Sequence, residues 1–147
     1  MDHKLTYEIF KYSSYSTSYL PENIREDCPS NQVSRWSSNT NTPPQFLTLK
    51  LQRPAIVKNI KFGKYEKTHV CNLRKFKVMG GLDEEHMLLL FEGGLKNDSI
   101  PETFDLRHTT DSGELMPLMY VEMIGQDDPL LVRSSLRHYN MYVYSMR

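Results

Sequence analysis

The chain has 147 residues and a mass of 17.3 kDa, the size of one ordinary domain. Hydrophobic residues make up 39% and charged residues 24%, which is typical of a folded globular protein and excludes a disordered or fibrous chain. The formal net charge is zero, and no nucleic-acid-binding motif is found in the sequence. Both observations argue against nucleic acid as the partner.

Targeting and redox features are few. No run of eighteen apolar residues occurs, and the start of the chain lacks the long apolar segment of a secretory signal, so we expect a soluble protein that is not exported. Cys28 and Cys71 show neither a disulfide framework nor a metal-type spacing. We interpret both as small buried side chains, which mildly favours the cytosol.

Short runs of alternating apolar and polar residues predict β-strands along most of the chain. The clearest run is 46–51, where Leu47, Leu49 and Leu51 share one face between Pro43-Pro44 and Arg53-Pro54. In chain order, the predicted strands cover residues 7–15, 46–51, 56–62, 75–79, 102–107 and 119–124.

Two helices are also predicted. The first begins at Asp83 as N-cap, with Leu82 and Met87 as an apolar staple, and ends at Gly93-Gly94. The second begins at Asp128-Pro129, with Pro129 at the first helical position. Residues 140–147 are ambiguous between helix and strand. Together the elements predict an all-β sandwich or jelly roll with one short connecting helix and a C-terminal helix, a fold that carries function in its end loops.

Several segments resemble the amino-terminal discoidin-like domain of the muskelin family. They include SYLPENI (18–24), SRWSS (34–38), PPQFLTLKL (43–51), RPAIVKNIKFGKYEKTHVCNL (53–73) and KFKVMGG (75–81), and the resemblance runs from about Leu5 to Leu106. MYVEMIGQDDP (119–129) resembles the end of that domain, where a LisH motif begins. The resemblance implies a distorted discoidin-like jelly roll, in agreement with the predicted strands.

The resemblance also implies a domain organisation. Residues 5–125 are expected to form the discoidin-like domain, and residues 127–147 the incomplete start of a LisH-like helical segment. Members of the family carry a further strand and a long loop before the last strand, whereas here LMPLMYVEMIG runs the two regions together. We therefore expect the domain to lack its penultimate strand, which would leave an unpaired sheet edge.

Muskelin-family proteins are intracellular and carry kelch repeats. They mediate cell adhesion, spreading and cytoskeletal responses, and they belong to the CTLH ubiquitin ligase. By resemblance, we expect a non-catalytic protein-interaction module that binds other CTLH subunits or itself and resides in the cytoplasm, with the nucleus as an open alternative. A glycan-binding or phospholipid-binding discoidin domain remains the alternative function.

The candidate partner-binding residues lie in and next to the loop GKYEKTHVCN (63–72) between two predicted strands. Tyrosine supplies amphipathic contact area and the cations suit an acidic protein surface. The alternative is a solvated loop whose tyrosine folds back onto the sandwich. The set comprises Lys64, Tyr65, Lys67, His69 and Arg74.

Membrane binding and catalysis have less support. A membrane-binding loop would need an exposed Trp or Leu at its tip, but we expect the only tryptophan, Trp36, to pack in the core and donate a hydrogen bond through its indole N–H. The five histidines show no metal-ligand spacing, and His69 with Cys71 lacks the turn that activates a thiol. We predict no enzyme activity, metal or cofactor.

Charge is unevenly distributed along the chain. Residues 50–77 contain nine basic residues and one acidic residue, a net charge of +8, whereas residues 82–128 contain two basic and twelve acidic residues, a net charge of −10. If folding separated these blocks, the basic surface of one copy could meet the acidic surface of another. Such head-to-tail self-association would be sensitive to salt.

Overall fold

The computed structural model describes residues 5–15, 20–25, 30, 35–37, 45–64, 75–96, 98–126 and 142–144. Strands predominate in these ranges, and their only helix is the 3-10 helix η1 (Pro21–Arg25). The strands are β1 (Tyr7–Tyr12), β2 (Arg35–Ser37), β3 (Gln45–Ala55), β4 (Asn59–Phe62), β5 (Lys75–Gly81), β6 (Leu88–Gly94), β7 (Glu102–Asp105), β8 (Leu118–Gln126) and β9 (Tyr142–Tyr144). The all-β class is confirmed.

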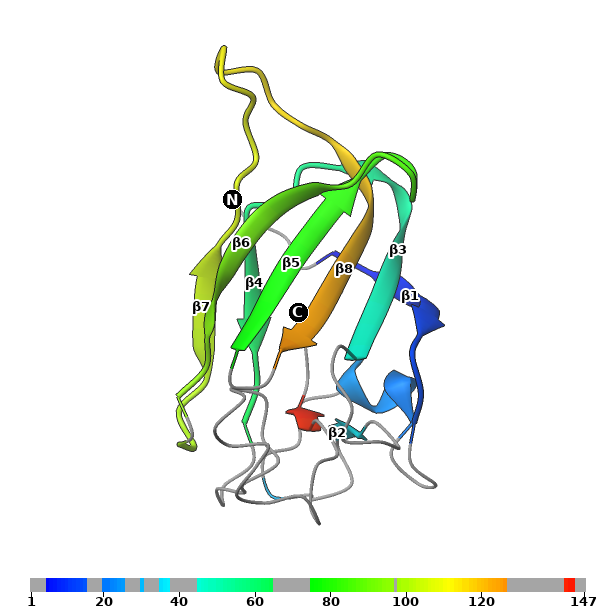
Figure 1. Ribbon diagram of the computed structural model, residues 1–147, viewed down its shortest axis with the longest axis vertical. Coiled ribbons are helices and arrows are strands. Elements are labelled where there is room, and N and C mark those ends of the chain that lie inside the picture. Colours follow the sequence, from blue (N-terminus) through cyan, green and yellow to red (C-terminus); the bar gives the residue numbers. More distant parts are fainter. Residues whose placement is uncertain are drawn as a thin grey trace.

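The larger layer is a five-stranded antiparallel sheet with the order β1-β3-β8-β5-β6. The second layer is the antiparallel pair β4-β7, which lies behind the larger sheet in Figure 1. A third antiparallel pair, β2-β9, lies near one end of the sandwich (Figure 1). We call this end, at the bottom of Figure 1, the lower end; β4 runs towards it and β5 starts from it.

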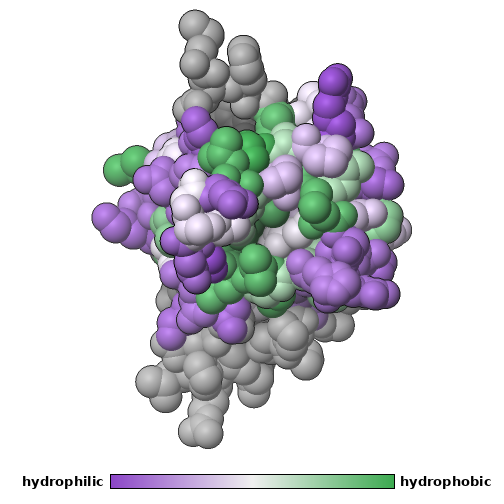
Figure 2. All heavy atoms as spheres, turned by 90° about the horizontal axis from the view of Figure 1, so that it is seen from above, coloured by the Kyte–Doolittle hydropathy of each residue, from purple (hydrophilic) through white to green (hydrophobic). Residues whose placement is uncertain are grey.

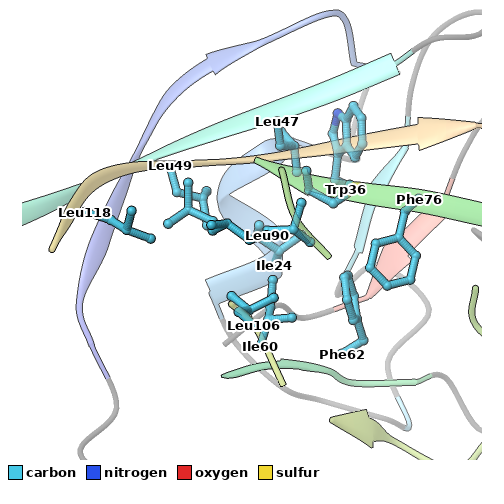
Figure 3. Packing of buried hydrophobic residues seen from close by; sticks show 13 residues of the cluster. Ile24, Trp36, Leu47, Leu49, Ile60, Phe62, Phe76, Leu90, Leu106 and Leu118 are labelled. Atoms are coloured by element: carbon cyan, nitrogen blue, oxygen red, sulfur yellow. The ribbon is translucent and has the colours of Figure 1, made fainter. Parts of the chain in front are cut away.

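The core lies between the two layers, and the period-two patterns explain why. On β3, Leu47 and Leu49 pair in register with Met123 and Val121 of β8, so the four side chains share the inner face. Thirteen buried hydrophobic residues form one cluster (Figure 3). They are Ile24, Trp36, Leu47, Leu49, Ile60, Phe62, Phe76, Val78, Leu90, Leu106, Leu118, Val121 and Met123.

Aromatic rings join the two layers of the sandwich. Phe62 of β4 meets Phe76 of β5 edge-to-face, with ring centroids 5.0 Å apart. Phe104 of β7 contacts the same Phe76 at 5.3 Å and Phe91 of β6 at 4.9 Å. Because such pairs add to the free energy of burial, this cluster holds the short pair β4-β7 against the larger sheet.

The predicted helix from Asp83 to Gly93-Gly94 is wrong. Residues 82–87 form a turn, and Leu88–Gly94 form strand β6, which pairs with β5. The Asp83 carboxylate caps this turn instead of a helix: Oδ1 accepts a hydrogen bond from the Glu85 N–H at 3.0 Å and lies 2.7 Å from His86 Nδ1. The apolar run LLLF then continues the sheet, because a short apolar run suits a strand as well as a helix.

The predicted helix at Asp128-Pro129 falls on residues outside the described part of the chain. No C-terminal helix is seen among the described residues. Residues 142–144, for which the sequence pattern is ambiguous, form strand β9. Each of the six predicted strands overlaps an observed one, although β4 and β7 are shorter than predicted. Strand β3 is longer and extends through Pro54, where its pairing with β8 becomes irregular. The predicted lack of a penultimate strand stays a prediction.

Candidate functional site

The predicted binding segment joins β4 to β5. Both flanking strands bring their ends to the lower end of the sandwich, so this segment starts and finishes there (Figure 1). Of the five candidate residues, only Lys64 lies in the described part of the chain. Tyr65, Lys67, His69 and Arg74 lie outside it, and their contact with a partner stays a prediction.

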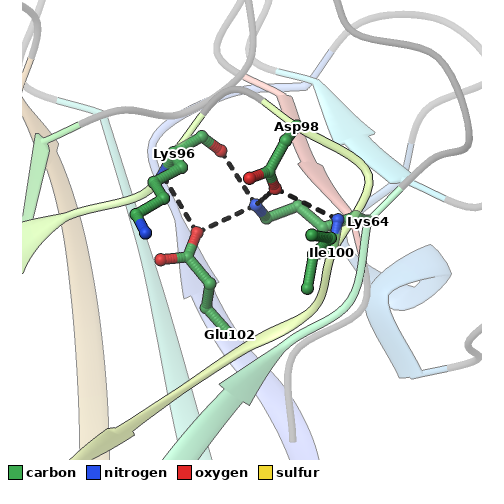
Figure 4. Close-up of polar contacts among 5 residues, drawn as sticks. All are labelled: Lys64, Lys96, Asp98, Ile100 and Glu102. Atoms are coloured by element: carbon green, nitrogen blue, oxygen red, sulfur yellow. Dashed lines mark hydrogen bonds and ion pairs between the residues drawn. The ribbon is translucent and has the colours of Figure 1, made fainter.

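Lys64 is buried rather than presented to a partner. Its side chain is 7% exposed, and its ammonium is surrounded by three oxygen atoms (Figure 4). Nζ donates to the Lys96 carbonyl at 2.8 Å, to Asp98 Oδ1 at 3.0 Å and to Glu102 Oε2 at 2.8 Å. An ammonium has three N–H donors, so these bonds use its full capacity.

The two carboxylates of this cluster also bond to backbone groups. Asp98 Oδ1 accepts from the Ile100 N–H at 3.1 Å, and Glu102 Oε2 accepts from the Lys96 N–H at 2.9 Å. The hydrogen bond from Lys64, followed by that from the Ile100 N–H, lowers the pKa of Asp98 below its ordinary value. Lys64, Asp98 and Glu102 therefore act together as a clamp between the end of β4 and the β6-β7 connection.

This clamp changes the role of Lys64. A buried ammonium whose donors are all used within the chain has none left for a partner, so in this structure Lys64 fixes the start of the predicted segment. No local sequence signal points to the clamp, because Asp98 and Glu102 lie 34 and 38 residues after Lys64. An exposed loop lysine and a buried one look alike in sequence until the tertiary partners are known.

The oppositely charged blocks of the sequence meet inside the described fold. Lys64 pairs with Asp98 and Glu102, and Lys77 lies 3.7 Å from Glu92 on the neighbouring strand. These pairs join a residue of the basic block to one of the acidic block. Part of the charge is thus neutralised within one chain, which leaves less of it for a contact between copies.

Trp36 lies in the core as predicted. It is 0% exposed, and its indole Nε1–H donates to the Ser14 carbonyl at 2.8 Å. Ser13 and Ser14 in turn donate through their hydroxyl groups to Gln45 Oε1 at 2.6 and 2.8 Å. These bonds connect the end of β1 to β2 and β3, so Trp36 has a structural role.

The upper end of the sandwich presents a mixed surface. Figure 2 views the molecule from this end and shows hydrophobic residues in several groups separated by hydrophilic ones. Leu115, in the long connection between β7 and β8, is 60% exposed. Among the described residues in this view, no single apolar surface dominates. Among the described residues, no helix has the length and apolar character needed to cross a membrane.

The fold is that of carbohydrate-binding modules. The CBM32 module of AlyQ, solved in complex with 4,5-unsaturated mannuronic acid, matches with a TM-score of 0.67 and 17% identity, covering 98% of this chain and 96% of that one. The CBM32-3 module of a family 31 glycoside hydrolase from Clostridium perfringens matches with a TM-score of 0.69 and 12% identity, covering 95% and 88%. At such identities the likeness establishes the discoidin-like jelly roll.

Sequence comparison identifies the family. Mei4-dependent protein 6 of Schizosaccharomyces pombe (strain 972 / ATCC 24843) is 44% identical over 109 residues, which cover 70% of this chain. The match spans only 16% of that relative's length. The family model described as Muskelin N-terminus matches residues 1–120. The chain therefore belongs to the muskelin N-terminal family.

Proposed function

We propose that this chain is a non-catalytic protein-interaction module whose binding surface lies at the lower end of the sandwich. Membership of the muskelin N-terminal family and the likeness to binding modules support this function. The observation that carries it is the clamp at Lys64, which fixes the start of the predicted segment on a rigid sheet. A loop fixed at its base loses less conformational entropy when it binds.

By family membership, the proposed wider role is that of a muskelin: a subunit of the CTLH ubiquitin ligase that mediates cell adhesion, spreading and cytoskeletal responses. Other CTLH subunits are the proposed partners, and the cytoplasm, with or without the nucleus, is the proposed location. Because the match covers 16% of its curated relative, only the part of that role performed by an amino-terminal domain is assigned to this chain.

The test compares partner recovery by two double variants. Tyr65→Ala/Lys67→Ala removes the proposed contacts but leaves the clamp intact, whereas Gln52→Ala/Arg53→Ala changes exposed residues on β3 as a control. Quantitative mass spectrometry after affinity purification from cells should show loss of CTLH subunits for the first variant only. Equal recovery for both variants would remove Tyr65 and Lys67 from the binding surface.

A glycan-binding module is the second candidate, and the fold favours it. The similar solved modules include one in complex with 4,5-unsaturated mannuronic acid and one in complex with galactose. Calorimetric titration of the purified chain with alginate oligosaccharides and with galactose tests this candidate. Saturable heat would promote it, and the same chain mixed with anionic phospholipid vesicles tests the lipid alternative.

Head-to-tail self-association is a further proposal from the charge blocks. Its support is weaker because Lys64 and Lys77 already pair with acidic residues of the same chain. Measuring the molar mass by light scattering at low and high salt tests it. An oligomer that dissociates as salt rises supports the proposal, whereas a monomer at both salt concentrations removes it.

A further inference from the structure

We propose that Tyr12 and Tyr15 form a docking site for a proline-rich segment of a partner protein, and that Gln45 is a positioning residue that holds the two tyrosines in place. The inference rests on the proposed function, because it names a class of partner for the same protein-interaction module. Every residue of this site lies in the described part of the chain. Both tyrosines lie outside the candidate set that the sequence predicts.

The two tyrosines form an exposed aromatic pair at the end of β1. Tyr12 is 45% exposed and Tyr15 is 39% exposed, and their rings meet edge-to-face with centroids 5.5 Å apart. Tyr12 pairs in register with the buried Leu47 of β3. Residues that pair across neighbouring strands point to the same face of a sheet, so Tyr12 points to the core side. Nearly half of this ring is nevertheless open, because β1 is the edge strand.

The backbone between the two tyrosines is fixed by buried groups. Ser13 and Ser14 donate through their hydroxyl groups to Gln45 Oε1 at 2.6 and 2.8 Å. The Trp36 indole N–H donates to the Ser14 carbonyl at 2.8 Å. The Ser13 N–H donates to the Phe46 carbonyl, and the Phe46 N–H donates to the Ser13 hydroxyl, both at 3.0 Å. Since Gln45 and Trp36 are buried, this network ties the tyrosine pair to the core.

Such an arrangement favours binding. A single exposed aromatic ring is common on protein surfaces and would not indicate a contact. Here two rings that touch each other are carried by one stretch of fixed backbone. Tyrosine supplies a large amphipathic area with few rotatable bonds, so a fixed pair loses little entropy when a partner covers it.

The polar groups beside the pair are already used within the chain. The hydroxyl groups of Ser13 and Ser14 bond to the side-chain oxygen of Gln45, and the Trp36 N–H bonds to a carbonyl. A sugar site needs polar groups directed at the ligand to fix its orientation. This site offers two aromatic rings and two phenolic hydroxyl groups instead, which suits a ligand with apolar area and a few acceptors.

The nearby charges disfavour an acidic partner segment. Lys11 Nζ lies 2.6 Å from Glu84 Oε2, so the cation next to Tyr12 is paired within the chain. Glu22 is an exposed acid of η1, and η1 lies beside the end of β1 (Figure 1). Like charges repel, so the partner segment should carry few Asp and Glu residues.

A proline-rich segment has the chemistry that remains. Its polyproline II backbone is extended before binding and has no internal hydrogen bonds, so its carbonyl oxygens can accept from the phenolic hydroxyl groups. Its pyrrolidine rings can pack on the faces of the tyrosines. Aromatic side chains are the recurring receptors of such segments, because a preformed polyproline II helix loses little entropy on binding.

Display selection with random dodecapeptides tests this occupant. Peptides selected on the wild-type chain should be rich in proline, with prolines about three residues apart, the period of a polyproline II helix. Their affinity, measured by fluorescence anisotropy, should fall about tenfold or more for Tyr12→Ala and for Tyr15→Ala. Tyr12→Phe keeps the ring but removes the hydroxyl group, so it should lose a smaller part of the affinity.

Phe10→Ala is the matched control. Phe10 is 37% exposed, lies on the same strand as Tyr12 and also forms an edge-to-face pair, with Tyr120 at 5.1 Å. Tyr120 alternates with the buried Val121 along β8, so this second pair lies on the outer face of the sheet. Peptide affinity should stay unchanged in Phe10→Ala. An equal loss in Phe10→Ala and Tyr12→Ala would reflect a general effect on β1 and would overturn the site.

Two variants of Gln45 test its positioning role. Gln45→Met keeps the length of the side chain but removes the oxygen that accepts from Ser13 and Ser14, so peptide affinity should fall several-fold. Gln45→Glu keeps an acceptor oxygen and should recover part of the affinity. Far-UV circular dichroism confirms that each variant is folded before the titration. If the affinity of Gln45→Met equals that of the wild-type chain, the positioning role is overturned.

The remaining outcomes separate this inference from the proposed function. Selected peptides without proline, proline-rich peptides that bind equally well to Tyr12→Ala and Tyr15→Ala, or a selection without any binder would each overturn the inference. Recovery of CTLH subunits with Tyr65→Ala/Lys67→Ala decides the proposed function separately, because that variant leaves the tyrosine pair intact. Saturable binding of galactose or an alginate oligosaccharide that Tyr12→Ala abolishes would assign the pair to a sugar and overturn the protein partner.

Discussion

Among single residues, Lys64 should be one of the charged side chains most sensitive to substitution, because its ammonium is buried while its acceptors are carboxylates. We expect Lys64→Met to lower the free energy of unfolding by about 1–3 kcal/mol, since it leaves two carboxylates without their cation at a partly exposed site. Urea denaturation measures this loss. Lys75→Met, at an exposed position, is the control and should change stability by less than about 0.5 kcal/mol.

The lowered pKa of Asp98 is a second effect of a single residue, because it makes the stability of the fold depend on pH. Because the fold lowers this pKa, the ionised carboxylate stabilises the folded chain above the ordinary aspartate pKa. This contribution should disappear as the pH falls through the lowered value. Asp83 has a lowered pKa as well, through His86, so the wild-type curve alone does not identify the residue.

The comparison with Asp98→Asn isolates this effect. We expect the wild-type chain to exceed the variant in stability at neutral pH and the difference to shrink in acid. Denaturant midpoints measured between neutral pH and about pH 3 test it. If the difference in stability stays constant over this pH range, the charge of Asp98 does not stabilise the folded chain.

At the scale of elements, the turn between β5 and β6 depends on Gly81. A Cβ atom at this position would lie 2.4 Å from the His86 carbonyl oxygen, a backbone atom that cannot move by side-chain rotation. We expect Gly81→Ala to destabilise the fold by about 1–3 kcal/mol, because the turn must shift. Thermal denaturation followed by circular dichroism measures it.

Gly113→Ala is the comparison for that glycine. Gly113 has a φ of 87°, and a methyl group there would meet open space, since no atom lies within 4 Å of its ideal Cβ position. The cost of this substitution comes from the backbone conformation alone, about 1 kcal/mol. If Gly81→Ala were milder than Gly113→Ala, the close packing of the turn would not matter for stability.

The pair β4-β7 depends on packing against the larger sheet, because a two-stranded sheet is marginal by itself. Phe62 is the side chain of this pair that is most buried, at 1% exposure, and it contacts Phe76 and Phe104. We expect Phe62→Ala to cost about 3–5 kcal/mol in urea denaturation. Leu115→Ala, on an exposed loop, should cost far less, and equal costs would contradict this account of the core.

At the scale of the whole molecule, one buried cluster connects both layers and η1. We therefore expect the described sandwich to unfold in a single transition. Trp36 is the only tryptophan and is 0% exposed, so its fluorescence reports the end near β2 while circular dichroism reports all strands. Coincident transitions would agree with one cooperative unit. A separate early fluorescence change would show that the lower end opens by itself.

Membership of the muskelin N-terminal family also describes the molecule as a whole. The amino-terminal match and the jelly roll describe a module, and this module corresponds to only 16% of the length of the relative that it matches. Any activity of the chain should therefore appear as binding, with loops on a rigid scaffold as the contacting parts.

The amino-acid sequence by itself determined the strands with clear alternation and the buried face of each. Leu47, Leu49 and Leu51, or Phe76 and Val78, are apolar at every second position, and this period survives folding because each strand has one face on the core. The inward position of Trp36 was predictable for a similar reason, since a large apolar ring with one N–H suits a buried site with one acceptor.

Tertiary structure alone decided the rest. Residues 88–91 are apolar without a period, so only pairing with β5 made them a strand and left Asp83 to cap a turn. Lys64 has the sequence character of a loop cation, and only the approach of Asp98 and Glu102 buried it. Contacts between residues more than thirty positions apart depend on how the layers pack, and a local pattern carries no information about that packing.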